Sequence, residues 1–529
     1  MSEGSAKQSS QSEAVKRVGL ATLILSAGIL CSRLLGYLRE AVIAYQAGAS
    51  AATDAYNAAF LLPDLMNYFL AGGTLSITFI PLLSAYLSKN DEANGHKLFS
   101  LIATTMGSIL LLAIIVAEIF TPQLVSLLFP GFNSAQIADT VTMTRVVLPA
   151  QLFHYLGGLM MAILMTRGKF LPSALAPLIY NLGIIVGGLL LAPHIGMMGF
   201  AVGALSGALL GPFLLPLIVA RPYIKFRPYF NFADPSFRKY WKLTLPLILG
   251  VSLTTVDEWL GRIIGSSMEV GSISWLNYAR RLCLVPIALV GQAASQAALP
   301  YLSRLAAAQN REKLAEVLTK TLRSVILLSL VASALFVVAA EPGVALVYER
   351  GAFSESDTAR TTVLLQCFSF GIVAWTVQMV MVRAYYAEQN TLSPMFITSV
   401  ITLLSIGLYY ALSQIFGLLG LALASSIGMA IQALSVMFFY RRKNPYFRIL
   451  PVAKSFAAAI GLGLASAAGA GLGLWISSQL PIFELHRSVS SLIQISASGA
   501  LGLVCAAVAS RFLCKAEFDA FKSKVLRRS

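Results

Sequence analysis

The sequence predicts an all-α, polytopic membrane protein with fourteen transmembrane helices. Of its 529 residues, 57% are hydrophobic and only 12% are charged, about half the charged fraction of a typical soluble domain. The mean hydropathy is +0.76. Apolar runs long enough to cross about 30 Å of hydrocarbon recur along the whole chain. A soluble fold is therefore excluded.

Each predicted helix corresponds to one of these apolar runs. The runs have approximate limits of 18–46, 54–87, 97–129, 136–165, 172–193, 196–220, 240–267, 272–303, 321–340, 357–387, 392–414, 417–440, 451–478 and 488–513. The second and the eighth are long and contain both glycine and proline, such as Pro63 and Pro286. We expect these two helices to bend, since proline removes a backbone donor.

Charge predicts the orientation of the chain in the membrane. The net charge is +16, and the basic residues gather in alternate connections and in both tails. This distribution is the positive-inside bias of a membrane protein and does not indicate a nucleic-acid partner. We therefore expect both termini on the cytoplasmic side.

Similar segments recur once along the chain at nearly constant spacing. The pairs are Pro81 and Pro300 (219 residues apart), Gly131 and Gly351 (220), and Pro172 and Pro394 (222). This spacing predicts two homologous halves of six helices each. Because six is even, the halves should share one topology and be related by a pseudo-two-fold axis along the membrane normal, with a cavity near the midplane between them.

The predicted domain organisation follows from the spans and the repeat. It comprises a cytoplasmic N-terminal tail (1–17), an N-lobe (18–220), a cytoplasmic linker (221–239), a C-lobe (240–440), two C-terminal helices (441–514) and a basic cytoplasmic tail (515–529).

The first span contains charged residues inside an apolar sequence. Arg33, Arg39 and Glu40 lie within it, and Asp54 opens the second span. Ionised groups at this depth cost a few kcal/mol, so they normally face a protein interior or a wet cavity. Arginine suits phosphate because its planar fork binds two oxygens and keeps its charge. We interpret both arginines as ligands for an anion. In the alternative, Arg39 extends to the membrane surface and Arg33 pairs with Glu40 or Asp54.

The seventh and eighth spans contain a second set of charges. Arg280 and Arg281 are adjacent and point about 100° apart on a helix, so we expect Arg281 in the cavity and Arg280 near its outer rim. Glu258 and Arg262 have the i,i+4 spacing of a helical ion pair. Asp257 is left either to balance Arg280 or to hold a coupling cation.

The remaining candidates are few. Asp64, in the second span, is expected to pair with a cavity arginine. The five cysteines are scattered and predict neither a disulfide nor a metal site. No catalytic or nucleotide-binding motif is found, so we expect a transporter without a cofactor rather than an enzyme or an ATP-driven pump. The membrane potential could then drive export of an anion, at about 2.3 kcal/mol per charge per 100 mV.

Several of these segments resemble the MurJ/MviN family of lipid II flippases. The similar segments are SRLLGYLREAVIAYQAGAS, ATDAYNAAFLLPDL, FIPLLSAYL, PGF and SISWLNYARRL, and the resemblance covers essentially the whole chain. It implies a multi-pass protein of the bacterial cytoplasmic membrane that moves an undecaprenyl-diphosphate-linked peptidoglycan precursor to the outer leaflet. The diphosphate would enter a cationic cavity, and the lipid tail would lie in a groove beside the last two helices. We expect a monomer, with the peptidoglycan synthesis machinery as a candidate partner.

The resemblance also assigns roles to individual residues. Arg33 and Arg39 match cavity arginines of the first helix, Asp54 matches the acidic residue opening the second, and Arg281 matches an essential arginine of the eighth. The chain departs from the family pattern where basic or acidic residues are usual; these departures are Leu61, Asn67, Tyr68, Gly72 and Arg280.

The departures keep other functions open. The first alternative is a flippase for another polyprenyl-diphosphate-linked oligosaccharide. The second is a cation-coupled exporter of small molecules with the same superfamily fold, for which Asp257 and Glu258 would be the site. The third is a membrane scaffold without transport activity, in which the arginines would be dispensable.

Overall fold

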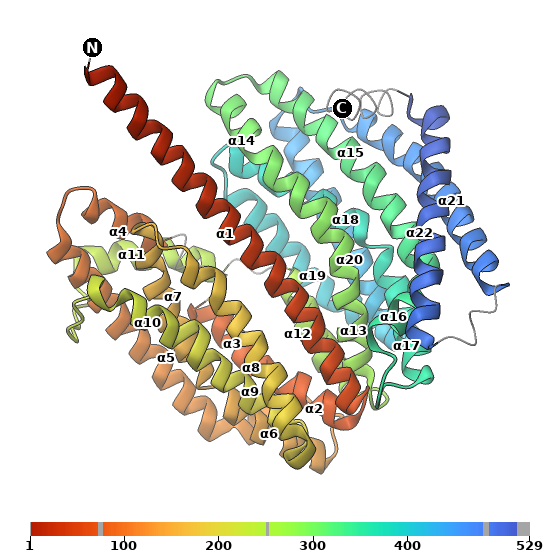
Figure 1. Cartoon of the computed structure of the whole chain (residues 1–529), viewed down its shortest axis with the longest axis horizontal. Coiled ribbons are helices and arrows are strands. Elements are labelled where there is room, and N and C mark those ends of the chain that lie inside the picture. The colour runs from red at the N-terminus through yellow and green to blue at the C-terminus, as the bar shows by residue number, and fades with distance from the viewer. Residues whose placement is uncertain (1, 72–77, 250–252, 480–485, 516–529) are drawn as a thin grey trace. The chain divides into compact units, whose positions relative to one another are not determined.

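The computed structural model describes residues 2–71, 78–249, 253–479 and 486–515 (Figure 1). Within these ranges the regular structure is helical throughout, without strands. The chain forms two compact units, Met1–Leu249 and Gly250–Ser529, which are described separately below. The predicted all-α class is therefore confirmed.

In its described residues, the first unit contains eleven α-helices and three short helices of other types. The α-helices are α1 (Ser2–Ala47), α2 (Ala51–Ala59), α3 (Leu61–Met66), α4 (Ile80–Leu87), α5 (Glu92–Leu128), α6 (Ser134–Val147), α7 (Ala150–Thr166), α8 (Leu171–Ile195), α9 (Met198–Ala208), α10 (Leu215–Ala220) and α11 (Pro235–Leu249). The others are the π-helices η1 (Asn67–Ala71) and η3 (Leu209–Leu214) and the 3₁₀-helix η4 (Arg221–Tyr223).

The second unit is also helical. It contains α12 (Leu253–Gly265), α13 (Ser272–Pro286), the π-helix η5 (Ile287–Gln292), α14 (Ala293–Ala307), α15 (Arg311–Val338), α16 (Ala340–Tyr348), α17 (Glu355–Ser369), α18 (Ile372–Ala387), α19 (Leu392–Phe416), α20 (Leu418–Lys443), α21 (Ile449–Ser478) and α22 (Arg487–Leu513).

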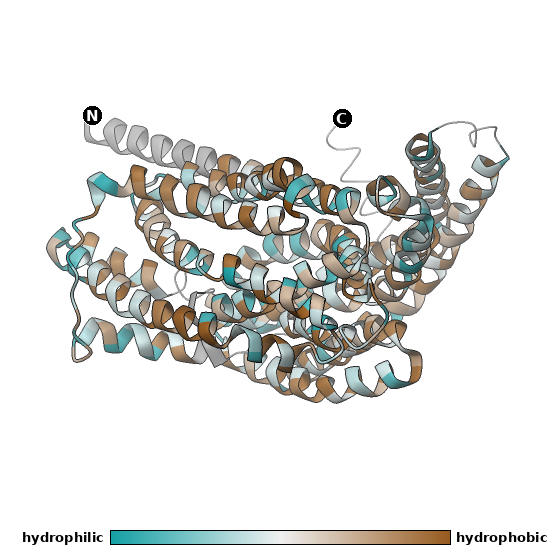
Figure 2. Ribbon diagram, turned by 90° about the horizontal axis from the view of Figure 1, so that it is seen from below, coloured by the Kyte–Doolittle hydropathy of each residue, from teal (hydrophilic) through white to brown (hydrophobic). Residues whose placement is uncertain are grey.

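Length and hydropathy mark many of these helices as membrane spans. In the described part of the chain, ten helices qualify, or eleven when α17 and α18, bent by 43°, count as one. Hydrophobic residues predominate along the helices, as Figure 2 shows. The expected spans at 54–87 and 240–267 contain residues outside the described ranges, and the expected span at 18–46 lies within α1. A multi-pass membrane protein is confirmed, and the number fourteen stays a prediction.

Prolines interrupt α-helical hydrogen bonding at the expected places. The π-helix η1 follows Pro63 in α3, and the π-helix η5 follows Pro286 at the end of α13. Proline has no N–H and its ring clashes with the turn before it, and in both spans a π-helix, which has wider turns, follows the proline. Both spans therefore depart from regular α-helix near these prolines, and a bend in either stays a prediction.

Glycines allow very close packing between α8 and its neighbours. A Cβ atom at Gly203 on α9 would lie 2.6 Å from the carbonyl oxygen of Gly183 on α8. A Cβ at Gly28 on α1 would lie 2.6 Å from the Cβ of Ala174 on α8. Small residues let membrane helices approach closely enough for extensive van der Waals contact. Helix α8 therefore packs closely against both α1 and α9.

In the second unit, helix α12 contacts three other helices. It packs against α13, α19 and α20. Its buried residues Val256 and Asp257 are 7% and 4% exposed. These contacts bring an acidic residue of α12 against three other helices.

We predict that Gly203→Leu lowers the stability of the protein. The new side chain would collide with the backbone of α8, and overpacking of this kind costs about 1–3 kcal/mol. A lower thermal unfolding temperature in detergent would be observed. The control is Gly499→Leu on α22, where a Cβ meets no atom within 4 Å. Equal unfolding temperatures for both variants would contradict the packing described here.

Candidate functional site

In the first unit, Arg39 on α1 is held by two partners. Its Nη2 donates to Glu40 Oε1 at 2.5 Å, and its Nη1 donates to Asn181 Oδ1 of α8 at 3.1 Å. Asn181 in turn donates through Nδ2 to the carbonyl oxygen of Pro177 at 3.0 Å. The Arg39 side chain is 17% exposed and that of Glu40 is 5% exposed. This cluster fixes a guanidinium on the part of α1 that packs against α8.

The other predicted residues of the first unit have different environments. Arg33 on α1 is exposed, Asp64 on α3 is half-buried, and Asp54 on α2 is buried. Asp54 lies one residue after Thr53, whose backbone N–H donates to the capping hydroxyl of Ser50. Glu40 is thus a partner of Arg39, whereas the alternative interpretation paired Glu40 with Arg33. The substrate-binding roles of Arg33, Arg39 and Asp54 stay predictions.

In the second unit, Asp257 on α12 accepts hydrogen bonds from three helices. Its donors are Arg280 Nη1 on α13, Tyr409 OH on α19 and Ser425 Oγ on α20, the last at 2.9 Å. All four residues are buried, with Arg280 the most exposed at 7%. The guanidinium of Arg280 also lies over the Trp375 ring, 5.6 Å from its centroid. Of the two expectations for Asp257, the structure therefore shows the balance with Arg280.

Glu258 lies beside this ion pair and faces several arginines. Its Oε1 is 3.5 Å from Arg280 Nε. The positive charges of Arg281 and Arg262 also attract its carboxylate. The Glu258 side chain is 35% exposed, and Arg281 and Arg262 are half-buried. A small cavity of about 30 Å³ adjoins Asp257, Glu258 and Arg262, which is enough for about one water molecule. The expectation that Arg280 lies near an outer rim is not met, because Asp257 draws it into the protein interior.

One carboxylate of each cluster falls at nearly the spacing of the predicted repeat. Glu258 follows Glu40 by 218 residues (258 − 40), close to the repeat displacement. In each case a carboxylate near the start of a predicted six-helix half lies beside an arginine. The arginines do not share this spacing, since Arg39 precedes Glu40 on α1 whereas Arg280 lies on α13.

Three polar residues complete these clusters without having been predicted: Asn181, Tyr409 and Ser425. Asn181 interrupts the apolar run 172–193, so its isolation in that run was a usable signal. Tyr409 and Ser425 lie among other aromatic and hydroxyl residues and had no comparable signal. Among the departures from the family pattern, Leu61 is buried, Asn67 is exposed and Gly72 lies outside the described residues.

An apolar groove of about 700 Å³ lies along α21 in the second unit. Its walls come from α15, α18, α20 and α21, and include Leu330, Val373, Met437 and Phe456. Phe456 is 44% exposed. The groove is long enough to involve several turns of α21, from Ile449 to Ala467, and its lining is suited to a hydrocarbon chain.

In the described part of the chain, no group of three or more His, Cys, Asp or Glu residues has a metal-binding arrangement. The two clusters consist of guanidinium groups with carboxylate, amide and hydroxyl partners. Guanidinium groups form charge-assisted hydrogen bonds with carboxylates and phosphates.

Comparison with known proteins identifies the family. Residues 43–490 match the family model described as lipid II flippase MurJ. The chain is 28% identical over 424 residues to a probable lipid II flippase MurJ of Vibrio cholerae, covering 78% of this chain and 81% of the relative. It is 27% identical over 441 residues to the lipid II flippase MurJ of Burkholderia cenocepacia, covering 80% and 84%.

Solved structures show the same fold. A lipid II flippase MurJ in an inward closed conformation matches with a TM-score of 0.76 at 23% identity, covering 93% of this chain and 99% of that structure. A multidrug resistance MATE transporter of the MOP superfamily matches with a TM-score of 0.65 at 16% identity, covering 81% and 98%. Because the family model spans most of the chain, this protein belongs to the lipid II flippase MurJ family.

Proposed function

We propose that this protein moves lipid II from the cytoplasmic to the outer leaflet of a bacterial cytoplasmic membrane. The observation that carries the proposal is the match of residues 43–490 to the lipid II flippase family. The buried arginine clusters and the apolar groove support it, since the substrate combines a diphosphate with a long hydrocarbon tail. The protein would act as a monomer with fourteen transmembrane helices and both termini in the cytoplasm.

Transport would proceed by alternating access between two lobes of six helices. Arg33 and Arg39 from the first lobe and Arg281 from the second would bind the diphosphate. Two unit charges 4 Å apart attract by about 4 kcal/mol at an effective dielectric constant of 20. Glu40 and Asn181 would keep the Arg39 fork oriented before substrate arrives, which lowers the entropy cost of binding. The substrate would bias the populations of inward and outward states.

The hydrocarbon tail would lie in the groove along α21. The groove is lined almost entirely by apolar side chains, so a tail placed there loses no hydrogen bonds. The tail can then follow the head group without leaving a membrane-like environment. In this proposal the arginines bind the head group and the groove binds the hydrocarbon tail.

Asp257 would serve as the counter-charge of Arg280 rather than as the ligand of a mobile cation. A calcium or sodium ion needs several oxygen ligands, whereas the Asp257 carboxylate already accepts from Arg280, Tyr409 and Ser425. The guanidinium supplies the positive charge from within the chain. The inside-negative membrane potential would then drive export of the anionic substrate, at about 2.3 kcal/mol per charge per 100 mV.

A second candidate function is export of a different polyprenyl-diphosphate-linked glycan. The observation in its favour is the loss of usual basic residues at Leu61, Asn67 and Tyr68. It uses the same arginines and groove and differs only in the sugar. Rescue of cells lacking a flippase for another lipid-linked glycan, without rescue of lipid II export, would favour it.

We predict that Arg39→Ala and Arg281→Ala each abolish rescue of bacteria depleted of their own lipid II flippase. Each change removes a charge-assisted contact to the diphosphate, and Arg39→Lys should restore less than full activity because the fork is lost. Growth and the accumulation of inner-leaflet lipid II would be measured. Arg441→Ala, at the exposed end of α20, is the control. Full rescue by both alanine variants at wild-type expression would refute the proposed cationic site.

We predict that Asp257→Asn destabilises the protein and that Asp257→Asn combined with Arg280→Met recovers much of the loss. Removing one member of a buried ion pair costs about 3–5 kcal/mol because the other charge is left uncompensated. Thermal unfolding of the purified single and double variants would show the recovery. If the double variant is as unstable as the sum of the two single variants, Asp257 and Arg280 are not coupled.

We predict that lipid II translocation in proteoliposomes is the same in sodium and in potassium buffers, because Arg280 occupies the Asp257 carboxylate. An inside-negative potential should still increase the rate. Loss of translocation on removal of sodium, reversed by adding it back, would show that a cation site exists despite this ion pair.

A further inference from the structure

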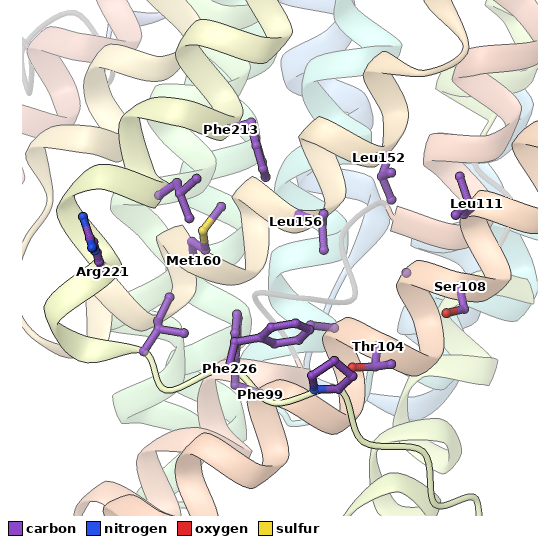
Figure 3. Close-up of a pocket in the computed structure, with 15 residues that line it drawn as sticks. Phe99, Thr104, Ser108, Leu111, Leu152, Leu156, Met160, Phe213, Arg221 and Phe226 are labelled. Carbon is purple, nitrogen blue, oxygen red and sulfur yellow. The ribbon is translucent and has the colours of Figure 1, made fainter.

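A second apolar hollow, of about 500 Å³, lies within the first unit (Figure 3). Its walls are α5, α7, η3 with α10, and the chain that follows η4. It is separate from the groove along α21, which belongs to the other unit. The proposed transport mechanism gives it no role.

The segment after η4 forms one wall through alternate residues. Ile224, Phe226 and Pro228 line the hollow, whereas the intervening Lys225 and Arg227 are exposed. Ile224 has extended backbone angles (φ −124°, ψ 124°), and side chains of an extended chain alternate in direction. The segment therefore presents an apolar side to the hollow and a basic side away from it.

This segment is fastened to α5 by backbone hydrogen bonds. The N–H of Arg227 donates to Ser100 Oγ at 3.1 Å, and the N–H of Tyr229 donates to Thr104 Oγ1 at 3.4 Å. Phe226 also makes an edge contact with Phe99 of α5, with ring centroids 6.3 Å apart. These contacts fix the segment beside α5.

Several large apolar side chains that line the hollow are partly exposed. Phe226 is 52% exposed, Leu111 45% and Leu217 38%. Leu111 and Leu217 belong to membrane-length helices, Glu92–Leu128 and Met198–Tyr223. Apolar surface of this extent at a membrane-spanning helix is covered by hydrocarbon in the native environment.

One end of the hollow has a basic residue. Arg221 is the single charged residue among those that line it, and it lies at one end of the group drawn in Figure 3, away from Leu111 and Ser108. Arg221 is exposed, and no side chain in the described part of the chain pairs with it. It follows the last turn of α10, where its stem can lie along the apolar wall while its guanidinium reaches the polar region.

We propose that this hollow binds one anionic glycerophospholipid. An acyl chain would lie between α5, α7, α10 and the 224–228 segment, and the phosphate would accept hydrogen bonds from Arg221. Because the lining includes arginine and no carboxylate, it favours a net negative head group over a zwitterionic one. Lys225 and Arg227, on the outer side of the same segment, add positive charge near that surface. The site does not depend on the identity of the exported lipid.

The test uses the full-length protein purified in detergent and titrated with defined lipids in native mass spectrometry. Phosphatidylglycerol and phosphatidylcholine with the same acyl chains are compared. We expect preferential binding of phosphatidylglycerol. Arg221→Ala should weaken it about fivefold, the factor equivalent to about 1 kcal/mol per basic residue at an anionic surface, and should weaken phosphatidylcholine binding less, because choline offsets the charge of its phosphate. Arg441→Ala should change neither.

A second variant tests where the acyl chain binds. Gly107 on α5 lines the hollow, and a Cβ there would meet no atom closer than 3.8 Å, so the leucine of Gly107→Leu would start without a backbone clash and extend into the hollow. It should weaken binding of both lipids, whereas Gly407→Leu on α19, where a Cβ meets no atom within 4 Å, should not. Wild-type binding by both Arg221→Ala and Gly107→Leu would overturn the proposal. Stabilisation against heat by inorganic phosphate equal to that by phosphatidylglycerol would also overturn it.

Discussion

The compensation of charge inside apolar helices is the constraint on which the rest of the structure depends. An ionised side chain in hydrocarbon costs at least a few kcal/mol, so each arginine or carboxylate must find a partner within the protein. Arg39 finds Glu40 and Asn181, and Arg280 finds Asp257. The contacts of Arg39 with Asn181 and of Arg280 with Asp257 join different helices and orient both guanidinium groups. Arg39 is both held by such partners and proposed to bind the diphosphate.

Helix packing brings these charges together. Gly28 and Gly203 allow α1 and α9 to approach α8 closely, and that approach brings Arg39 to Asn181. In the second unit, α12 contacts α13, α19 and α20, which supply Arg280, Tyr409 and Ser425. The apolar grooves lie elsewhere, along α21 and between α5, α7 and α10.

The sequence predicted the helical class and the charged residues because both signals are local. Apolar runs of membrane length are visible without any tertiary information, and so are Arg39, Glu40, Asp257 and Arg280. Pairing was harder to predict. Adjacent residues on one helix point about 100° apart, so the partner of Arg280 depends on which neighbouring helix offers a carboxylate, and that is a tertiary property. Tyr409, 152 residues from Asp257 along the chain, could not be assigned to it from spacing.

The central claim is that guanidinium groups bind the diphosphate of a lipid-linked substrate. The most direct measurement compares the affinity of the purified protein for lipid II with its affinity for undecaprenol, which has the same hydrocarbon tail without the diphosphate and glycan, and for undecaprenyl diphosphate. If the arginines bind the diphosphate, undecaprenyl diphosphate should bind at least about tenfold more tightly than undecaprenol, a difference of about 1.4 kcal/mol. Equal affinity for undecaprenol and undecaprenyl diphosphate would contradict the account.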